Sequence, residues 1–396
     1  MADDSENEPE NPTPKQPADP IRATVAGNKF ELIESGEARL EAILELIGGA
    51  RKRLRLLFYM FNNDDCGRRV IDAVVEACKR GVKVEMLLDG FGCADPDLEF
   101  FEGVSDAGGS FCMFHARYGR RYLVRNHQKL AIADDDKAII GGSNIHDSYL
   151  KDEGPKHWRD LWLTIDGPAV KHACGYFDDI YRWTTAKGSK LWSLRQLIAD
   201  HNQTEGAVQW KFNGPFSRRQ TWTSAFNKEL ESVERLDLIA AYFSPHRSML
   251  RRLMRVAQRG KVRIITASKS DNRATVAAAR HTYRRLLRRG VEMYEYQPAR
   301  LHTKLAITDN SVHIGSSNFD FRSLYLNLEI MLRIEDSDFV KAMRGYFERE
   351  MTDSEQITPE LHRERSNMFS RMRWQVSHWL VTSMDYTVTR RLNIGG

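Results

Sequence analysis

The sequence predicts a duplicated α/β fold, with two similar domains related by a pseudo-twofold axis and one site shared between them. Three observations lead to this prediction. The chain has 396 residues, which is too long for one core of ordinary size. A helix–strand–helix–strand order occurs twice, and a short polar motif occurs once in each half. The composition, 41% hydrophobic and 29% charged, is typical of a globular protein and excludes disorder of the whole chain.

The first copy of the repeat follows from hydrophobic periodicity and a glycine stop. We expect a helix over residues 41–51, a buried strand over 54–60, a second helix over 68–79 and a strand over 82–88. Gly81 ends the second helix. This order is that of a βαβ unit.

The second copy has the same order: helix 223–233, strand 236–242, helix 247–258 and strand 262–267. The segment CKRGVKVEMLL matches AQRGKVRIITA, and the glycines of the two segments are 179 positions apart. A coincidence between two unrelated α/β segments is the alternative. A duplicated domain accounts for both the order and the period.

Domain boundaries follow from composition. Residues 1–20 hold five of the twelve prolines and six acidic residues, so we expect a disordered tail. We expect the first half over residues 21–205, the second half over 206–350, and a helical tail over 351–396. This last segment is a candidate membrane-surface anchor.

Charge and cysteine content indicate a peripheral protein of a reducing compartment. Six of the 54 acidic residues and one of the 59 basic residues lie in the first twenty positions, so the rest carries 58 basic and 48 acidic residues. A basic surface attracts phosphates of anionic lipid or nucleic acid. Five cysteines without CxxC spacing favour a reducing compartment. We find no signal peptide and no apolar run long enough to span a bilayer, and expect a cytoplasmic location with peripheral attachment to the cell membrane.

The most informative residues are two copies of the motif H-x-K-x4-D followed by G-x-x-N. NHQKLAIADDDKAIIGGSN carries the first and LHTKLAITDNSVHIGSSN the second, and their histidines are 175 positions apart. A single copy would be weak evidence, whereas two copies at equivalent places in a repeat are not expected by chance. The candidate catalytic residues are His127, Lys129, Asp134, His302, Lys304 and Asp309.

The spacing of each motif has a structural reason. LAIA and LAIT are short apolar strands, and the polar residues after each predict a hairpin turn. A histidine and a lysine two positions apart on an extended chain project from the same face. If the halves pack with these strand ends facing each other, two imidazoles and two ammonium groups meet at one place.

Such a group of side chains suits phosphodiester transfer without a metal or cofactor. One neutral histidine can attack phosphorus while the other, protonated, donates its proton to the leaving alkoxide. The lysines can neutralise the non-bridging oxygens. We find no metal-ligand motif, because there is no HExxH and no carboxylate cluster at ligand spacing. A phosphohistidine intermediate is expected.

The paired motifs resemble those of the phospholipase D superfamily, and within it the chain is most similar to bacterial cardiolipin synthases. LLDGFG, KHWRDLWLTIDGPAV and GSSNFDFRSLYLNLEIML carry the resemblance, which runs from about residue 30 to residue 350. It implies one active site between the duplicated domains and an anionic phospholipid such as phosphatidylglycerol as substrate. It also implies that His127 is the nucleophile and His302 the acid and base, although pseudo-symmetry permits the reverse.

The resemblance further implies supporting residues. An acidic residue about thirty positions after each H-x-K holds the opposite histidine, so Asp160 would orient His302 and Glu329 would orient His127. Asn144 and Asn318 would line the phosphate site. Within the motifs, Asp134 and Asp309 are expected to hold the hairpins rather than to touch substrate. Gly142 replaces the serine of the GSxN pattern, so the two halves need not contribute equally.

Two further segments bear on the substrate. Arginines 117, 120, 121 and 125, with Tyr118 and Tyr122 between them, could bind an anionic headgroup or nucleic acid, or form a solvated loop. Apolar residues recur at helical spacing near the C-terminus, with arginines 365, 371 and 373 nearby: Phe369, Met372, Val376, Trp379 and Leu380. They predict either an interfacial anchor or a helix packed on the domain.

The sequence therefore favours a cardiolipin synthase-type phosphatidyl transferase. The first alternative is a phospholipase D that hydrolyses phospholipids to phosphatidic acid, since water can attack the same intermediate. The second is a nuclease, which would need stacking aromatics and a phosphate-tracking groove; we regard nucleic acid as the less favoured partner. A non-enzymatic membrane scaffold ranks last, because the six catalytic residues are intact.

Overall fold

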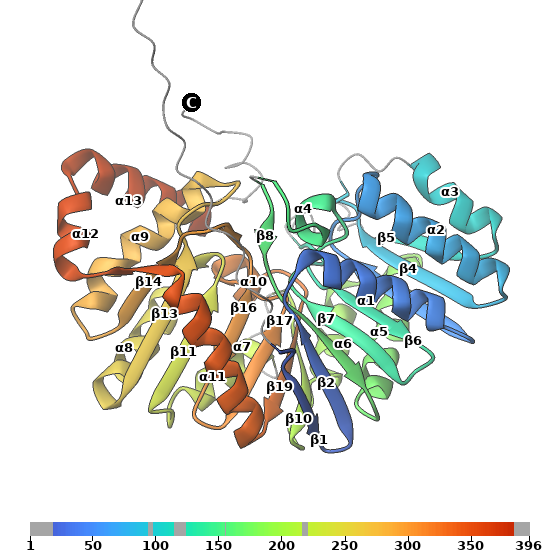
Figure 1. The fold of residues 1–396 in the computed structure, drawn as a ribbon, viewed down its shortest axis with the longest axis horizontal. Helices are drawn as coiled ribbons and strands as arrows, with labels where there is room; N and C mark the ends of the chain where they lie inside the picture. The colour runs from blue at the N-terminus through green and yellow to red at the C-terminus, as the bar shows by residue number, and fades with distance from the viewer. Residues whose placement is uncertain (1–18, 94–97, 115–123, 155, 216–220, 384–396) are drawn as a thin grey trace, which may run out of the picture.

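Two eight-stranded mixed sheets, one per half of the chain, lie side by side with helices packed against both faces of each sheet (Figure 1). The computed structural model describes residues 19–93, 98–114, 124–154, 156–215 and 221–383. Residues 1–18 of the predicted tail and arginines 117, 120 and 121 with both neighbouring tyrosines lie outside this range. No helix of the described part is long and apolar enough to cross a membrane.

The first sheet has the strand order β1-β2-β9-β7-β6-β3-β4-β5. Strands β3, β4 and β5 are parallel to one another, and the remaining neighbours are antiparallel. The bounds are β1 Arg22–Val25, β2 Asn28–Ile33, β3 Arg53–Phe58, β4 Lys83–Asp89, β5 Ser110–Phe114, β6 Leu130–Ala133, β7 Lys137–Gly141 and β9 Trp162–Asp166.

The second sheet repeats this arrangement in the order β10-β19-β17-β16-β11-β13-β14-β20. The bounds are β10 Val208–Asn213, β11 Arg235–Ala240, β13 Lys261–Ala267, β14 Glu292–Tyr296, β16 Lys304–Ile307, β17 Ser311–Gly315, β19 Glu329–Glu335 and β20 Ser354–Ile357. Six consecutive strands, from β19 to β14, take the places of β9 to β5. The predicted duplication is confirmed.

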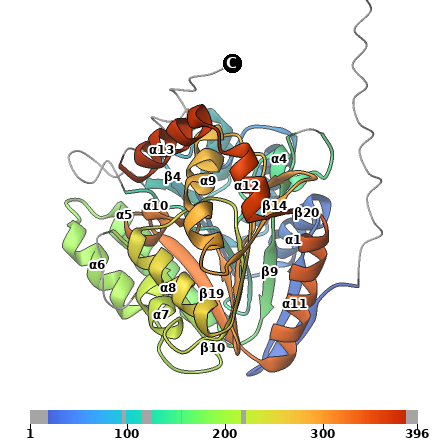
Figure 2. The same ribbon diagram turned by 90° about the vertical axis from the view of Figure 1, so that its left-hand side faces the viewer.

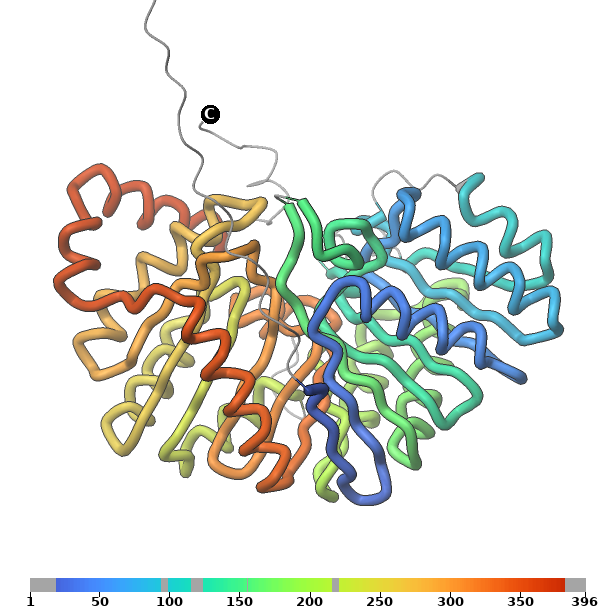
Figure 3. The backbone as a smooth tube through the Cα atoms, in the orientation of Figure 1, coloured from blue at the N-terminus to red at the C-terminus, as the bar shows by residue number. Residues whose placement is uncertain are grey.

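The helices complete two α/β domains. The first half contains α1 Gly36–Gly49, α2 Asp65–Lys79, α3 Leu98–Asp106, α4 Asp147–Leu150, α5 Val170–Thr185 and α6 Leu191–Asp200. The second contains α7 Trp222–Glu229, α8 Arg247–Arg259, α9 Arg273–Leu287, α10 Phe321–Tyr325, α11 Ser337–Thr352, α12 Pro359–Arg365 and α13 Met368–Ser383. Figure 2 shows the helices of the second half from the side, and Figure 3 traces the path of the whole chain.

Local sequence accounts for the helix starts. Ser35 accepts a hydrogen bond from the Ala38 amide at the start of α1, and Asp64 accepts one from the Gly67 amide at the start of α2.

All eight elements predicted for the repeat are present, and their ends differ by a few residues. The largest start difference is at α1, which begins five residues before the predicted position because its cap is Ser35.

The predicted boundary at residue 350 needs a correction. Residues 354–357 form β20, which pairs antiparallel with β14 at the edge of the second sheet. The helical tail therefore begins at Pro359, where Thr358 caps α12. A four-residue edge strand has too short a pattern to separate from the surrounding helices.

One hydrophobic core crosses the boundary between the sheets. It combines buried residues of the first half, such as Leu57 and Leu130, with buried residues of the second, such as Ile239 and Leu305. Each domain also has its own cluster beneath its outer helices. The halves consequently form one packed unit rather than two beads on a linker.

The two repeat glycines are required for different reasons. Gly81 has a φ of +85°, which a residue with a side chain adopts only with strain. At Gly260 the φ is ordinary, but a Cβ atom would lie 2.0 Å from the carbonyl oxygen of Glu234. Space, rather than backbone angle, selects glycine at the second position.

We expect Gly260→Ala to destabilise the protein by about 2 kcal/mol or more, because the backbone at Glu234, just before β11, must move. Gly48→Ala, on α1 where a Cβ atom would meet nothing within 4 Å, is the matched control. It should leave stability unchanged or raise it slightly, by about 0.5–1 kcal/mol. Urea unfolding followed by circular dichroism measures both, and equal midpoints for the two variants would contradict the packing argument.

Candidate active site

The two motifs meet because the domains exchange backbone hydrogen bonds at the motif histidines. The His127 amide donates to the carbonyl of Leu328 (2.9 Å), and the His302 amide donates to the carbonyl of Arg159 (2.7 Å). Two short parallel β-bridges accompany these bonds. One joins Asn126 to Leu328, and the other joins β8 (Trp158–Arg159) to β15 (Arg300–Leu301). The two contacts are reciprocal, as a pseudo-twofold axis requires.

Each histidine is paired with a carboxylate of the other domain. His127 Nδ1 lies 3.0 Å from Glu329 Oε2, and His302 Nδ1 lies 2.6 Å from Asp160 Oδ2. Both carboxylates are buried. Since a carboxylate only accepts, Nδ1 carries the proton in each ring, and Nε2 is left as the reacting nitrogen. Asp160 and Glu329 are the residues that the family resemblance implies as partners of these histidines.

The imidazoles lie in a site that strongly disfavours charge. Burial lowers the pKa of His127 to about 4, against the opposing effect of Glu329. Burial and the nearby Lys304 lower the pKa of His302 to about 3, against the effect of Asp160. The pKa of Asp160 is also lowered, because Lys304 and His302 outweigh its burial. Both pKa values lie below 7, which favours the neutral imidazoles at neutral pH.

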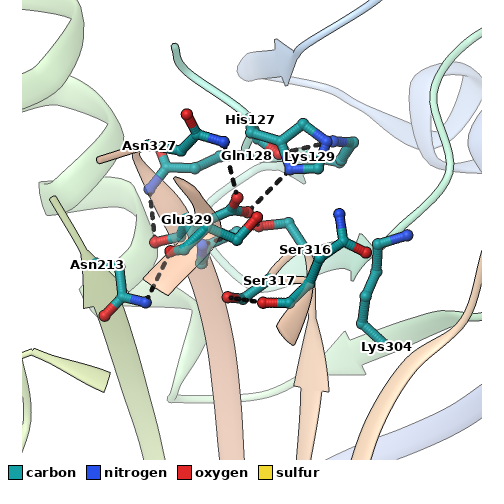
Figure 4. A network of polar contacts seen from close by, with 12 residues as sticks. His127, Gln128, Lys129, Asn213, Lys304, Ser316, Ser317, Asn327 and Glu329 are labelled. Atoms are coloured by element: carbon teal, nitrogen blue, oxygen red, sulfur yellow. Dashed lines mark hydrogen bonds and ion pairs between the residues drawn. The ribbon is translucent and has the colours of Figure 1, made fainter. Parts of the chain in front are cut away.

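The motif lysines are buried beside the histidines, as Figure 4 shows for Lys129, Lys304 and His127. Lys129 Nζ donates to the carbonyl of His127 (2.6 Å), and Lys304 Nζ donates to the carbonyl of His302. Burial lowers the pKa of Lys129 to about 7 and that of Lys304 to about 8. An anion bound between these amines would favour their charged forms.

The supporting asparagines differ between the halves. Asn144 Oδ1 accepts a hydrogen bond from the Met60 amide (3.2 Å), so this oxygen holds the scaffold. The Oδ1 atom of Asn318 is buried, and within the described ranges nothing donates to it. Of the two oxygens, that of Asn318 has capacity for a ligand.

The glycine at position 142 has a steric cause. Its counterpart Ser316 donates a hydrogen bond to Glu329 and accepts one from the Ile330 amide. A Cβ atom on Gly142 would lie 2.6 and 2.7 Å from the two carboxylate oxygens of Asp160. The first motif therefore has no space for the serine, and the two carboxylates have different partners.

Asp134 and Asp309 do not belong to the reacting centre, so their place among the candidate catalytic residues is corrected. Each follows its motif strand at the end opposite the histidine. Asp134 accepts hydrogen bonds from the backbone amides of residues 51–53, at 2.7 to 2.9 Å. Asp309 accepts from those of residues 234 and 235, both at 2.8 Å. These carboxylates fix the hairpins to the starts of β3 and β11.

Sequence reasoning missed the aromatic rings around the histidines. The Tyr59 ring lies 5.0 Å from that of His127. The His302 ring has neighbours on three elements or loops, at centroid distances of 5.1, 5.3 and 6.3 Å: Tyr149, Trp158 and Tyr242. They come from separate parts of the chain, so no spacing rule could have grouped them. Of these aromatic residues, only Trp158 lies in one of the segments that carry the family resemblance.

Asp89 was also missed. It ends β4 and is buried, and it accepts hydrogen bonds from the backbone amides of Asn126 (2.7 Å), Phe91 and Gly92 (both 2.9 Å). Its burial raises its pKa to about 6. The carboxylate thus ties the residue before His127 to the sheet. A lone acidic residue directly after a buried strand, in LLDGFG, was the available signal.

Potential metal ligands gather elsewhere. In the described part of the chain, Asp65, Cys66 and Asp147 are the one group of three whose ligand atoms lie close together. Lys151 makes ion pairs with both carboxylates, at 3.0 and 2.9 Å, so a cation already occupies the position that a metal would take.

Fold and site together define the phospholipase D class, in which two H-x-K motifs form one centre between duplicated domains. A family model described as "Cardiolipin synthase, PLD-like domain" matches residues 43–180 and 228–351. The chain belongs to this family.

Relatives of known sequence and structure agree with this assignment. The chain is 32% identical to cardiolipin synthase B of Escherichia coli (strain K12) over 330 residues, which cover 80% of this chain and 79% of the relative. It is 29% identical to cardiolipin synthase A of Pseudomonas fluorescens, covering 86% and 72%. The crystal structure of phosphatidylserine synthase of Haemophilus influenzae has the same fold, with a TM-score of 0.72 and 14% identity, over 94% of this chain and 96% of that one.

The burial of the motif lysines predicts that the stability of the folded protein depends on pH. Unfolded Lys129 takes up a proton below its ordinary pKa of 10.5, whereas the folded protein takes it up only near pH 7. Stability of the native chain therefore falls as the pH is lowered through this window. We expect Lys129→Met to be more stable than the parent, by about 1–3 kcal/mol at pH 7 and less at pH 10. Urea unfolding across this range measures the difference.

Lys171 on α5 is exposed and serves as the matched control. The substitution Lys171→Met should change stability little and by the same amount at each pH. A Lys129→Met variant whose stability relative to the parent does not depend on pH would contradict the proposed burial of a titrating amine.

Proposed function

We propose that the chain is a cardiolipin synthase that moves a phosphatidyl group from one phosphatidylglycerol to the terminal hydroxyl of another, or to a related alcohol. The products are cardiolipin and glycerol. The single observation that supports this most is the pair of crossed histidine–carboxylate contacts in a chain of the cardiolipin synthase family.

In the first step, Nε2 of His127 attacks phosphorus, and the bond from phosphorus to the oxygen of the headgroup glycerol breaks. His302 donates its proton to that oxygen, so glycerol leaves and phosphatidyl-His127 remains. The anionic diester favours the protonated form of His302, and Asp160 stabilises that form from the other side. Lys129 and Lys304 neutralise the non-bridging oxygens as charge builds there.

In the second step, His302 is neutral and removes the proton of the incoming hydroxyl. The resulting alkoxide attacks phosphorus, the bond from phosphorus to His127 breaks, and cardiolipin is released. The assignment of His127 as nucleophile is supported by its accessibility: its side chain is 13% exposed, against 4% for His302. The nucleophile must bring its Nε2 atom into bonding distance of phosphorus. A proton donor needs only the N–H edge of its ring to be accessible to the leaving oxygen.

The alternatives differ in the donor and the acceptor. Water in place of the second lipid would make the protein a phospholipase D, and a polynucleotide phosphodiester as the donor, with water as the acceptor, would make it a nuclease. Among the described residues, the rings near the histidines lie around the reacting imidazoles, at centroid distances of 5.0 to 6.3 Å, which supports a lipid headgroup over a row of stacked bases. We propose an anionic membrane surface as the working partner and a peripheral position at the cell membrane.

A product assay tests this function. Purified full-length protein is supplied with phosphatidylglycerol in detergent micelles, and lipids and glycerol are measured. We expect cardiolipin and free glycerol in equal amounts, and a loss of about 10²- to 10⁴-fold in rate for both His127→Ala and His302→Ala. Phosphatidic acid without cardiolipin would instead establish hydrolysis. Cleavage of single-stranded DNA at a comparable rate would establish the nuclease.

The space beside Asp160 yields a second prediction about the reaction. Gly142→Ala should lower the rate by about 10- to 100-fold, because the new methyl group displaces the carboxylate that holds His302. Ser316→Ala is the matched control at the equivalent position, since it keeps the Cβ atom and removes only the hydroxyl group, which bonds to Glu329 and to the Ile330 amide. A larger loss for Ser316→Ala than for Gly142→Ala would contradict the steric account.

A further inference from the structure

The helix α13 exposes an apolar surface on its outer side. Five large side chains along it are exposed by half or more: Met368 (78%), Phe369 (74%), Met372 (61%), Val376 (51%) and Trp379 (59%). At 3.6 residues per turn these positions fall on one side of the helix. We call these five residues the α13 stripe.

The stripe is not an unpacked core face, because the opposite side of α13 is already packed. Trp374 and Val381 are buried. The His378 ring stacks on that of His281 of α9 at 4.7 Å, and the Trp374 ring stacks on that of His362 of α12 at 5.3 Å. Of the two sequence interpretations of this segment, the structure shows the helix packed on the domain. It packs on the domain and presents a second apolar face outward.

Charges beside the stripe are positive. Residues 368–383 contain no aspartate or glutamate. Arg371 and Arg373 are exposed and flank the stripe on its two sides, and neither forms an ion pair with any described residue. Arg247, at the start of α8, lies close enough to His378 to help lower its pKa. Apolar side chains flanked by arginines match the acyl boundary and the phosphates of an anionic bilayer.

The helix also lies near the His302 side of the active site. It contacts β12 (Phe243–Ser244), which directly follows Tyr242, and the Tyr242 ring is 6.3 Å from that of His302. Figure 1 shows α13 along the same edge of the molecule as β8 and α4, which carry Trp158 and Tyr149. A membrane touching α13 would face the edge at which the histidines lie.

We propose that the α13 stripe inserts into the headgroup–acyl boundary of an anionic phospholipid bilayer and so places the active-site edge against its substrate. The proposal rests on the proposed function, in that it takes the substrate to be a membrane lipid. The flanking arginines favour lipid phosphates over a second copy of this chain, whose stripe would bring the same positive charges.

Vesicle co-sedimentation of the full-length chain tests the proposal. The double variant Phe369→Ser/Trp379→Ser should bind vesicles of phosphatidylcholine with phosphatidylglycerol about tenfold or more weakly than the parent. Arg371→Gln/Arg373→Gln should weaken binding to these vesicles and leave any binding to pure phosphatidylcholine unchanged. Trp192→Ser is the matched control, because Trp192 on α6 is 71% exposed and lies outside the stripe. It should bind like the parent.

Activity in detergent micelles separates this proposal from the proposed function. We expect the Phe369→Ser/Trp379→Ser variant to keep its micellar rate and to lose activity on vesicles in proportion to binding. Parent-like vesicle binding by this variant would overturn the role of the stripe, even if cardiolipin is made. A change from dimer to monomer with unchanged vesicle binding would show that a second copy covers the stripe. Vesicle binding that depends on the stripe, without any lipid product, would instead support the membrane-binding surface and contradict the proposed enzymatic function.

Discussion

The reciprocal contact between the two domains is the constraint on which the site depends. Neither half holds its own histidine: each ring is paired with a carboxylate of the other half, and the backbone amide of each histidine donates to a carbonyl of the other half. The site therefore exists only when the sheets are packed together. The hydrophobic core that crosses the sheet boundary stabilises that packing, and it must also offset the cost of burying ionisable groups at the same place.

The electrostatics of this junction serve anion binding more than stability. Two lysines and two histidines are buried together, and burial lowers the pKa of all four. Two carboxylates compensate them in part, as expected for a site that is completed by a negative ligand. A phosphodiester has a negative charge and hydrogen-bond acceptors that complement these lysines and histidines. The same groups that weaken the folded chain thus give it selectivity for a phosphate-bearing substrate.

Sequence patterns predicted the parts of this arrangement that repeat. The strands and helices around Gly81 and Gly260 follow from periodicity, and the crossed partners Asp160 and Glu329 followed from the family resemblance. Features that depend on contact across the chain were not accessible. Tyr149 and Tyr242 approach His302 from separate elements, Asp89 acts through the backbone before His127, and β20 is too short to leave a pattern. The steric reason for Gly142 appears only once Asp160 is placed beside it.

The differences between the halves give the pseudo-symmetric site a direction. A symmetric pair of histidines would have equal claims to each role, whereas here Glu329 shares its charge with Ser316 and Asp160 faces a glycine. The pKa values of the two rings differ as well: that of His302 is lowered further than that of His127, because Lys304 adds to the effect of burial there. The apolar stripe adds a second asymmetry, since the main contacts of α13 with other described elements are those to α9 and β12 of the second domain. With the roles proposed above, such differences would give the duplicated fold one nucleophilic half and one half that handles protons, with lipid approaching from the latter.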